Sequence, residues 1–212
     1  LTGIVYGVNQ TDTGVKFLMR DLTGGITVFS KKINYYSVTE GDSLMVQGTV
    51  SSNRGLAQFI NLDTIIKIAG SKSLKNPSIA TGLNESNEND LLKISNIMFY
   101  NLPSGGKWPS TETDVLCHTK DQTDTIVIHI LPKFGLAGKN LPSSKQFTAI
   151  GLSAQKSKST SSPFANNGYF IMPRSSSDII DGLATPDSLT AIKLTSKTIT
   201  SLKLSWTKPV TT

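Results

Sequence analysis

One nine-residue pattern occurs twice in the chain, and the segments around each copy follow the same order. The two copies are "RDLTGGITV" at residues 20–28 and "KDQTDTIVI" at residues 120–128. Both have a basic residue, Asp, Thr, Ile and a final Val or Ile at equal spacing. Segments with alternating apolar residues flank each pattern, which is typical of two strands joined by a tight turn. Asp and Thr can hydrogen-bond nearby backbone N–H groups, so the repeat marks a turn of a duplicated β-structure.

Five strands are expected in each half of the chain. Gly48 and Gly151 each fall inside the fourth strand, where glycine often marks a bulge or a sharp coil of a small closed barrel. Five strands with an irregular connection after the third match the OB-fold, a Greek-key barrel. The expected strands lie in "LTGIVYGVN", "GVKFLMRD", "GITVFS", "DSLMVQGTV" and "GLAQFINLDTIIKI", then in "LLKISNIMFY", "TDVLCHTK", "DTIVIHI", "KQFTAIGLS" and "GYFIMP".

The domain boundaries follow from the composition between these strands. We expect one OB-like domain over residues 1–70, a polar, turn-rich linker over 71–89 and a second OB-like domain over 90–181. The tail, residues 182–212, alternates as two strands and ends near "LSWTKP".

Composition excludes several classes of protein. Cys117 is the only cysteine, so an intramolecular disulfide and cysteine-rich zinc sites are excluded, and we expect this residue to be buried on a strand. No apolar run reaches about 18 residues, so membrane insertion is not expected. The net charge of +6 permits contact with polyanions, but the basic residues are dispersed, and a generally solvated surface is the favoured explanation. The chain opens at Leu1 inside an apolar pattern, so we expect an internal piece of a longer protein.

The two units together suggest a family. The first, with "FLMRDLTGGITVFS", resembles the OB-fold repeats of large secreted Bacteroidetes proteins, and the second, with "LLKISNIMFYN" and "GYFIMPRSSSDI", resembles the companion repeat. Such repeats are similar to accessory domains of extracellular nucleases and accompany type IX secretion signals. The tail from Thr185 resembles the opening of a fibronectin type III domain, with Trp206 as its core tryptophan. The implied fold class is all-β: two tandem OB-like five-stranded barrels plus an incomplete immunoglobulin-like (fibronectin type III) segment.

The same resemblance implies O-glycosylation at Asp-Ser/Thr-apolar tripeptides. The chain contains "DSL" twice and "DTI" twice, although such tripeptides also arise by chance in a Thr-rich sequence. The candidate acceptor residues are Ser43, Thr64, Thr125 and Ser188.

A ligand-binding face is expected on the first unit. OB-folds usually bind ligands across the exposed face of strands two and three. In the first unit this face combines bases with aromatic rings, which a single-strand binder needs; the alternative is a structural barrel with a solvated face. The candidates are Lys16, Leu18, Arg20, Thr27, Phe29 and Lys31, with Tyr35 and Tyr36 in the adjoining loop.

The second unit places both histidines of the chain on neighbouring strands. A bend centred between residues 122 and 123 puts His118 and His129 diagonally on one face, within reach of each other. Asp114 and Lys120 share that face, but we expect Asp114 to lie too far along the strand to complete a metal site. The alternative is a row of exposed polar strand positions.

These features favour a non-catalytic accessory or spacer segment of a secreted or cell-surface bacterial protein. No nucleophile elbow, Cys/His pair or dinucleotide fingerprint occurs, so we expect no enzyme activity, cofactor or metal. The expected partners are other domains of the same long chain and the secretion machinery. One alternative is a single-stranded nucleic-acid-binding module that assists an extracellular nuclease. Another is a glycan-binding or adhesin module, in which Trp108 grips a sugar instead of folding back on the barrel end.

Overall fold

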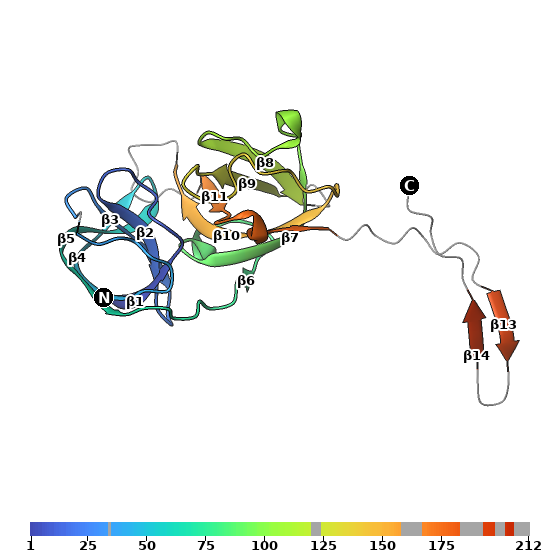
Figure 1. Cartoon of the computed structure of the whole chain (residues 1–212), viewed down its shortest axis with the longest axis horizontal. Helices are drawn as coiled ribbons and strands as arrows, with labels where there is room; N and C mark the ends of the chain where they lie inside the picture. Colours follow the sequence, from blue (N-terminus) through green and yellow to red (C-terminus); the bar gives the residue numbers. More distant parts are fainter. Residues whose placement is uncertain (34, 120–123, 158–166, 183–192, 198–201, 206–212) are drawn as a thin grey trace. The chain divides into compact units, whose positions relative to one another are not determined.

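The computed structural model describes residues 1–33, 35–119, 124–157, 167–182, 193–197 and 202–205, and these are almost entirely β-structure (Figure 1). The chain divides into two compact units, Leu1–Asp181 and Gly182–Thr212. Within the described ranges, no helix is both long and apolar enough to cross a membrane.

The first half of the larger unit is a closed five-stranded barrel with the order β1-β2-β3-β5-β4. All neighbours are antiparallel except β3 and β5, which run parallel. The strands confirm the five that the alternating segments predicted: β1 (Thr2–Tyr6), β2 (Val15–Arg20), β3 (Gly25–Ser30), β4 (Ser43–Asn53) and β5 (Leu56–Ala69).

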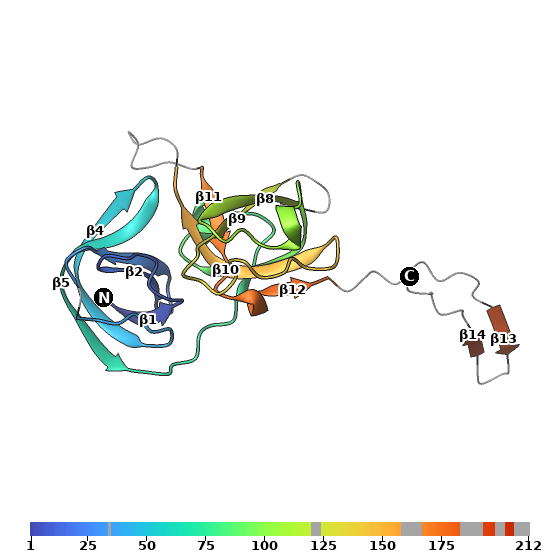
Figure 2. The same cartoon turned by 45° about the horizontal axis from the view of Figure 1, so that its top comes forward.

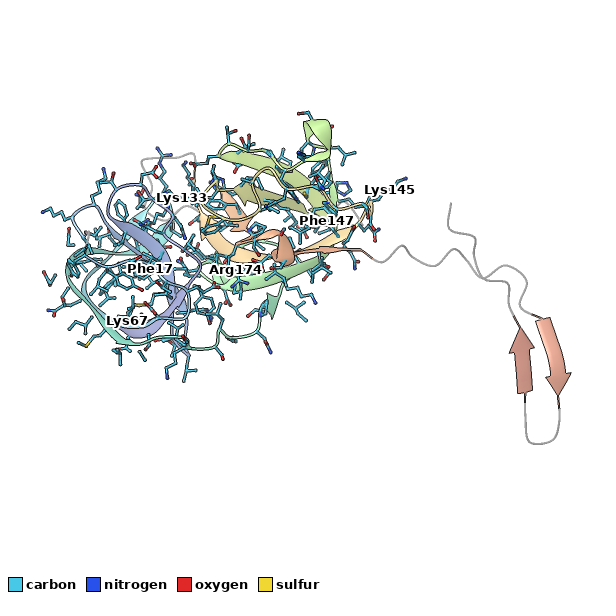
Figure 3. All side chains as sticks on the ribbon, in the orientation of Figure 1. Phe17, Lys67, Lys133, Lys145, Phe147 and Arg174 are labelled. Carbon is cyan, nitrogen blue, oxygen red and sulfur yellow. The ribbon has the colours of Figure 1, made fainter. Side chains whose placement is uncertain are left out.

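The interior of this barrel follows from the two-residue period of its strands. Val15, Phe17 and Met19 alternate along β2 and point to one face, so all three join the same buried cluster. Phe17 is fully buried there (Figure 3) and packs edge-on against Tyr36 at 5.9 Å between ring centroids.

The second half repeats the arrangement. The strands β7 (Leu91–Phe99), β8 (Thr113–Thr119), β9 (Thr125–Ile130), β11 (Tyr169–Met172) and β10 (Phe147–Gln155) are neighbours in this order. Because β10 also pairs with β7, these five strands close into a ring. Again the third and fifth strands, β9 and β11, are the parallel pair. The all-β fold with OB-like barrels is therefore as predicted.

Two short strands extend the second ring. The strand β6 (Ser78–Ile79) pairs in parallel with β7, and β12 (Ile179–Asp181) pairs with β10. Part of the predicted linker is thus ordered on the second barrel. The remaining elements of the larger unit are the 3-10 turns η1 (Glu85–Asn87), η2 (Ser104–Gly106) and η3 (Ser176–Asp178).

Glycines in the fourth strands allow close approach of the fifth strands. A Cβ at Gly48 would lie 2.6 Å from a carbonyl oxygen of β5, and one at Gly151 equally close to a carbonyl oxygen of β11. The strand pairing shifts at Gly48, which confirms a bulge there. Of the two predicted alternatives at Gly151, a bulge or a sharp coil, the bulge is excluded, because the shift in β10 falls between Phe147 and Ala149. At Gly151, only the close approach of β11 requires a glycine.

The repeated motif forms the expected turn in the first copy. The Asp21 carboxylate accepts hydrogen bonds from the backbone N–H of Thr23 at 2.7 Å and of Gly24 at 2.9 Å, and from the Thr23 hydroxyl. These bonds, the Thr23 hydroxyl first, hold the pKa of the Asp21 carboxyl below its usual value. The bend of the second copy falls on residues 120–123, outside the described part of the chain.

The smaller unit contains a two-stranded antiparallel sheet. Its strands are β13 (Lys193–Lys197) and β14 (Leu202–Ser205), which agree with the two alternating segments of the tail. Trp206, on which the resemblance to a fibronectin domain depends, lies outside the described residues.

The two barrels of the larger unit lie side by side (Figure 2), and they share a third apolar core. The buried members of this cluster come from both rings, so the barrels are joined by a continuous interior. From the first barrel they are Tyr6, Leu18 and Leu56, and from the second Leu91, Phe134, Leu152, Ala154 and Met172.

This contact explains why the first copy of the motif has a glycine at position 25. A Cβ at Gly25 would lie 1.8 Å from the carbonyl oxygen of Asn89, just before the second barrel, whereas one at Gly24 would meet nothing within 4 Å. At the equivalent position of the second copy, Thr125 is exposed, and a side chain fits.

We therefore expect Gly25→Ala to destabilise the protein by about 1–3 kcal/mol, because the new methyl group must push the Asn89 backbone away. The neighbouring Gly24→Ala is the matched control and should change stability by no more than about 0.5 kcal/mol. Urea denaturation measures both. Equal effects of the two substitutions would show that Asn89 does not press on this turn.

Candidate functional site

The predicted ligand-binding face of the first barrel is covered by the second barrel. Leu18, Arg20 and Thr27 are only 2%, 8% and 3% exposed. Leu18 belongs to the shared core, which also includes Leu91 and Leu152 of the second barrel. The prediction that this face is exposed is therefore wrong in its central part, because the second barrel buries it.

Arg20 forms a buried ion pair instead of a ligand contact. Its Nε lies 2.9 Å from Oδ1 of Asp90, at an orientation that does not make a hydrogen bond. The Asp90 carboxylate also accepts hydrogen bonds from the Leu91 backbone N–H and the Ser78 hydroxyl. Since an unpaired buried charge is costly, Asp90 requires Arg20 at this position, and Arg20 has no freedom to bind a separate ligand.

Polar groups beside this ion pair also connect the barrels. The Thr27 hydroxyl donates to Oδ1 of Asn89 at 2.7 Å, and the Ala57 N–H donates to Oε1 of Glu88 at 2.9 Å. Burial raises the pKa of Glu88 to about 7, helped by the charge of Glu85, although the Ala57 hydrogen bond opposes this shift. Glu88 is thus a carboxyl group that titrates near neutral pH at the junction.

This shift predicts that the protein becomes less stable as the pH rises from about 5 to about 8. The folded protein binds the Glu88 proton more tightly than the unfolded chain, whose pKa is 4.5. The resulting stabilisation is complete below the unfolded pKa and is lost as the pH rises through about 7. Urea denaturation across this range should show the loss in the natural protein. Glu88→Gln keeps the acceptor oxygen but has no proton to lose, so it should have a flatter profile. Identical profiles would contradict the assignment.

Charged side chains at the edge of the junction add further contacts (Figure 3). Arg174 Nη1 lies 2.8 Å from Oε1 of Glu40, and its Nε lies 2.9 Å from Oδ2 of Asp178. Lys133 Nζ lies 2.6 Å from Oδ1 of Asp12. The pairs of Arg174 with Glu40 and of Lys133 with Asp12 join the two barrels, and such partly exposed pairs contribute little stability each, whereas Asp178 lies within the second barrel and holds Arg174 in place.

Lys16 lies at a cavity between the barrels rather than on an open face. The cavity has a volume of about 240 Å³ and is also lined by His129, Glu112 and Lys156 of the second half. Burial lowers the pKa of Lys16, and the charge of Lys156 lowers it further, while Glu112 opposes both effects. The junction therefore brings together Lys16 and His129, which the sequence placed on separate binding faces.

The second hairpin has a different register from the one predicted. His118 pairs with Thr125, and His129 pairs with Asp114, so one strand is displaced by two residues. A displacement of two residues preserves the faces but changes the neighbours. The predicted proximity of the two histidines is wrong, and so is the predicted remoteness of Asp114.

His129 has a fixed orientation in this arrangement. Its Nδ1 lies 2.7 Å from Oδ1 of Asp114, and its ring packs on Phe170 at 4.8 Å between centroids. The hydrogen bond from His129 lowers the pKa of the Asp114 carboxyl, although partial burial opposes this. The other ring nitrogen, Nε2, lies 3.5 Å from Oε1 of Glu112.

His118 has a structural environment. It is 7% exposed, its Nδ1 lies 2.8 Å from the Thr119 carbonyl oxygen, and its ring packs on Tyr100. Within the described ranges, no group of three or more His, Cys, Asp or Glu side chains is placed to hold a metal ion.

Trp108 is not available to grip a sugar. Its side chain is 1% exposed and packs against Phe99 and Phe147, with ring centroids 5.4 and 6.1 Å away. The alternative prediction, that Trp108 folds back onto the barrel, describes its position. The glycan-binding role predicted for this residue is wrong because the tryptophan is part of the core.

The other candidates of the first barrel lie away from the junction. Phe29 and Lys31, with Lys32 and Asn61, line a surface hollow of about 400 Å³. Tyr35 is 62% exposed, and its hydroxyl oxygen accepts a hydrogen bond from the Ile65 N–H at 3.1 Å. Lys120 lies outside the described residues.

The predicted glycosylation sites occupy different environments. Ser43 and Thr64 are half-buried on β4 and β5, whereas Thr125 is exposed at the start of β9. Ser188 is outside the described part of the chain. Of the three described residues, Thr125 is the most accessible, and glycosylation at all four stays a prediction.

Sequence reasoning missed several residues of the junction cavity, including Gln58, Glu112 and Phe170. They lie on different strands and loops of two barrels, and no local pattern marks them. The one signal available was the difference between Gly25 and Thr125 in the two copies, which indicates a close contact on the first hairpin. The sequence matches no protein-family model and no curated protein.

Proposed function

We propose that this chain is a non-catalytic accessory segment that spaces and orients other parts of a large secreted or cell-surface bacterial protein. The proposal places it in a protein exported by type IX secretion, on the basis of the resemblance of its two units to OB-fold repeats. Its partners are then the neighbouring domains of the same polypeptide and the secretion machinery.

The main support for the proposal is that the β2–β3 face of the first barrel, where an OB-fold usually binds its ligand, is instead the interface with the second barrel. In an OB-fold the face of strands two and three usually holds the ligand. Here that face contributes Leu18 to the shared core, Arg20 to a buried ion pair and Thr27 to a hydrogen bond. A covered binding face supports a spacer of fixed geometry better than it supports two independent binding modules.

The local chemistry also favours a non-catalytic role. Cys117 is fully buried, and burial raises the pKa of its thiol to about 12, so it is not a nucleophile at neutral pH. His118 and Trp108 are packed into the structure instead of facing a ligand.

A spacer of fixed geometry predicts one narrow distribution of distances between the barrels. Dyes attached at Asp63→Cys and Leu102→Cys report this distance by single-molecule energy transfer, because both positions are exposed and the buried Cys117 does not react. Leu18→Asp should broaden the distribution, because it puts a charge into the shared core.

Leu22→Asp is the control for this experiment, because Leu22 lies in the same hairpin and is fully exposed. It should leave the distribution narrow. A broad distribution in the natural sequence would overturn the proposal of a rigid spacer. The proposed export by type IX secretion is tested by the full-length gene, because a gene without a C-terminal secretion signal would argue against it.

Binding of single-stranded nucleic acid is the second candidate function. It is favoured by the hollow where Phe29 lies beside Lys31 and Lys32, because rings stack on bases and lysines attract phosphates. The glycan-binding or adhesin alternative no longer has Trp108 as its binding residue.

A labelled oligonucleotide tests this candidate by fluorescence anisotropy at low salt. Phe29→Ala should weaken binding by about 1–3 kcal/mol through the loss of one stacked base. Lys31→Ala should reduce the salt dependence, while Lys145→Ala, which alters an exposed lysine of the second barrel, should have no effect (Figure 3). The absence of binding at low salt would end this hypothesis.

A further inference from the structure

The junction cavity takes its walls from both barrels. Lys16 of β2 and Gln58 of β5 come from the first barrel. Glu112, His129 and Phe170 come from the second. Neither barrel alone contains this set of side chains, so the cavity exists only when the barrels are docked.

Lys16 contributes a cation whose ammonium group is not tied into an ion pair. In the part of the chain that the structure describes, its ammonium group makes no hydrogen bond and no ion pair, and burial and Lys156 lower its pKa more than Glu112 raises it. The charge of Glu112 offsets the desolvation of this ammonium group only in part, because the pKa of Lys16 is still lowered. An anion in the cavity would offset that cost.

Gln58 contributes an amide that can both donate and accept hydrogen bonds. It is 5% exposed and lines the cavity, and its side-chain amide makes no hydrogen bond to any described residue. Its neighbour on the adjacent strand, Thr27, is by contrast bonded to Asn89. The amide is therefore available to bond a ligand that enters the cavity, in competition with water.

The second barrel supplies fixed polar groups opposite these two. Asp114 and the ring of Phe170 hold His129 in place. The remaining nitrogen, Nε2, lies 3.5 Å from Glu112, which is longer than an ordinary N–H···O hydrogen bond. The cavity therefore has an imidazole nitrogen and a carboxylate with capacity for a further partner.

We propose that the junction cavity binds a small hydroxylated anion, of the class of uronic acids and sugar phosphates. Lys16 would bind the anionic group, and Gln58 and Glu112 would bind hydroxyls. The lining contains three cations, Lys16, Arg54 and Lys156, against the single carboxylate of Glu112, so the anionic group is favoured. At about 240 Å³, the cavity is smaller than the pockets of about 300–1,000 Å³ that hold drug-sized ligands, so the ligand is about one sugar residue in size.

Such a ligand would also fasten the barrels to each other. Because its contacts come from both barrels, it binds only the docked arrangement and stabilises that arrangement by mass action. The inference goes beyond a spacer function, and its failure would leave the spacer proposal unaffected.

Binding is tested on the full chain with three probes: sodium glucuronate, glucose 6-phosphate and uncharged glucose. Calorimetric titration and thermal unfolding should show binding of at least one of the two anions and none of glucose. The two anions distinguish a carboxylate ligand from a phosphate ligand. Amide signals of Lys16 in the first barrel and Phe170 in the second should shift together in NMR spectra.

Two substitutions locate the site. Lys16→Met should weaken binding of the anion at least about tenfold, since it removes a charge-assisted hydrogen bond. Gln58→Leu fills the same space without an amide and should also weaken it. Lys31→Met removes an exposed lysine outside the cavity and is the control that should bind normally. Failure of both anions to bind, equal binding of glucose, or unchanged binding by the folded Lys16→Met protein would overturn the proposal.

Discussion

Burial of the β2–β3 face of the first barrel is the constraint on which the rest of the structure depends. Leu18 occupies the shared apolar core, and beside it Arg20 is paired with Asp90 at 2.9 Å. A buried arginine with a single carboxylate partner is stable only if that carboxylate is held in place, and the Leu91 N–H and Ser78 hydroxyl hold it. The docking of the two barrels therefore explains why residues 78–91 have a defined structure.

Docking makes the two copies of one fold unequal. In the first copy the outer face is an interface, and Gly25 leaves room for the Asn89 backbone. In the second copy the corresponding hairpin carries Thr125 and Leu116, both exposed. Divergence between the copies thus has a physical origin, since a Cβ at Gly25 would collide with the Asn89 backbone whereas Thr125 at the equivalent position is exposed. The same docking leaves a small polar cavity where the two surfaces do not match fully.

Much of the fold could be predicted from the sequence because strand periodicity is a local property. Alternating residues such as Val15, Phe17 and Met19 identify a strand and its buried face without knowledge of its neighbours. The OB-like order of strands followed from repetition of the whole pattern. The register of the second hairpin could not be predicted. A slip of two residues keeps every side chain on the same face of the sheet, so the alternation of apolar and polar residues is equally compatible with both registers.

The candidate site was harder to predict because it depends on contacts between distant segments. Lys16 and His129 were each selected as binding residues, but the sequence does not show that they share one cavity. Leu18 and Arg20 look like surface residues of an isolated barrel and become buried only through the second barrel. Trp108, by contrast, was compatible with two positions, and packing with Phe99 and Phe147 decides between them.

The central claim, that both barrels form one cooperative structure, is tested most directly by native-state hydrogen exchange. If the shared core joins the barrels, the most protected amides of β2 and β10 open with the same free energy, equal to that of global unfolding. The opening free energies of the β2 and β10 amides should remain equal as the denaturant concentration is raised. Exchange of β10 amides through a separate opening of lower free energy, with β2 still protected, would contradict the account.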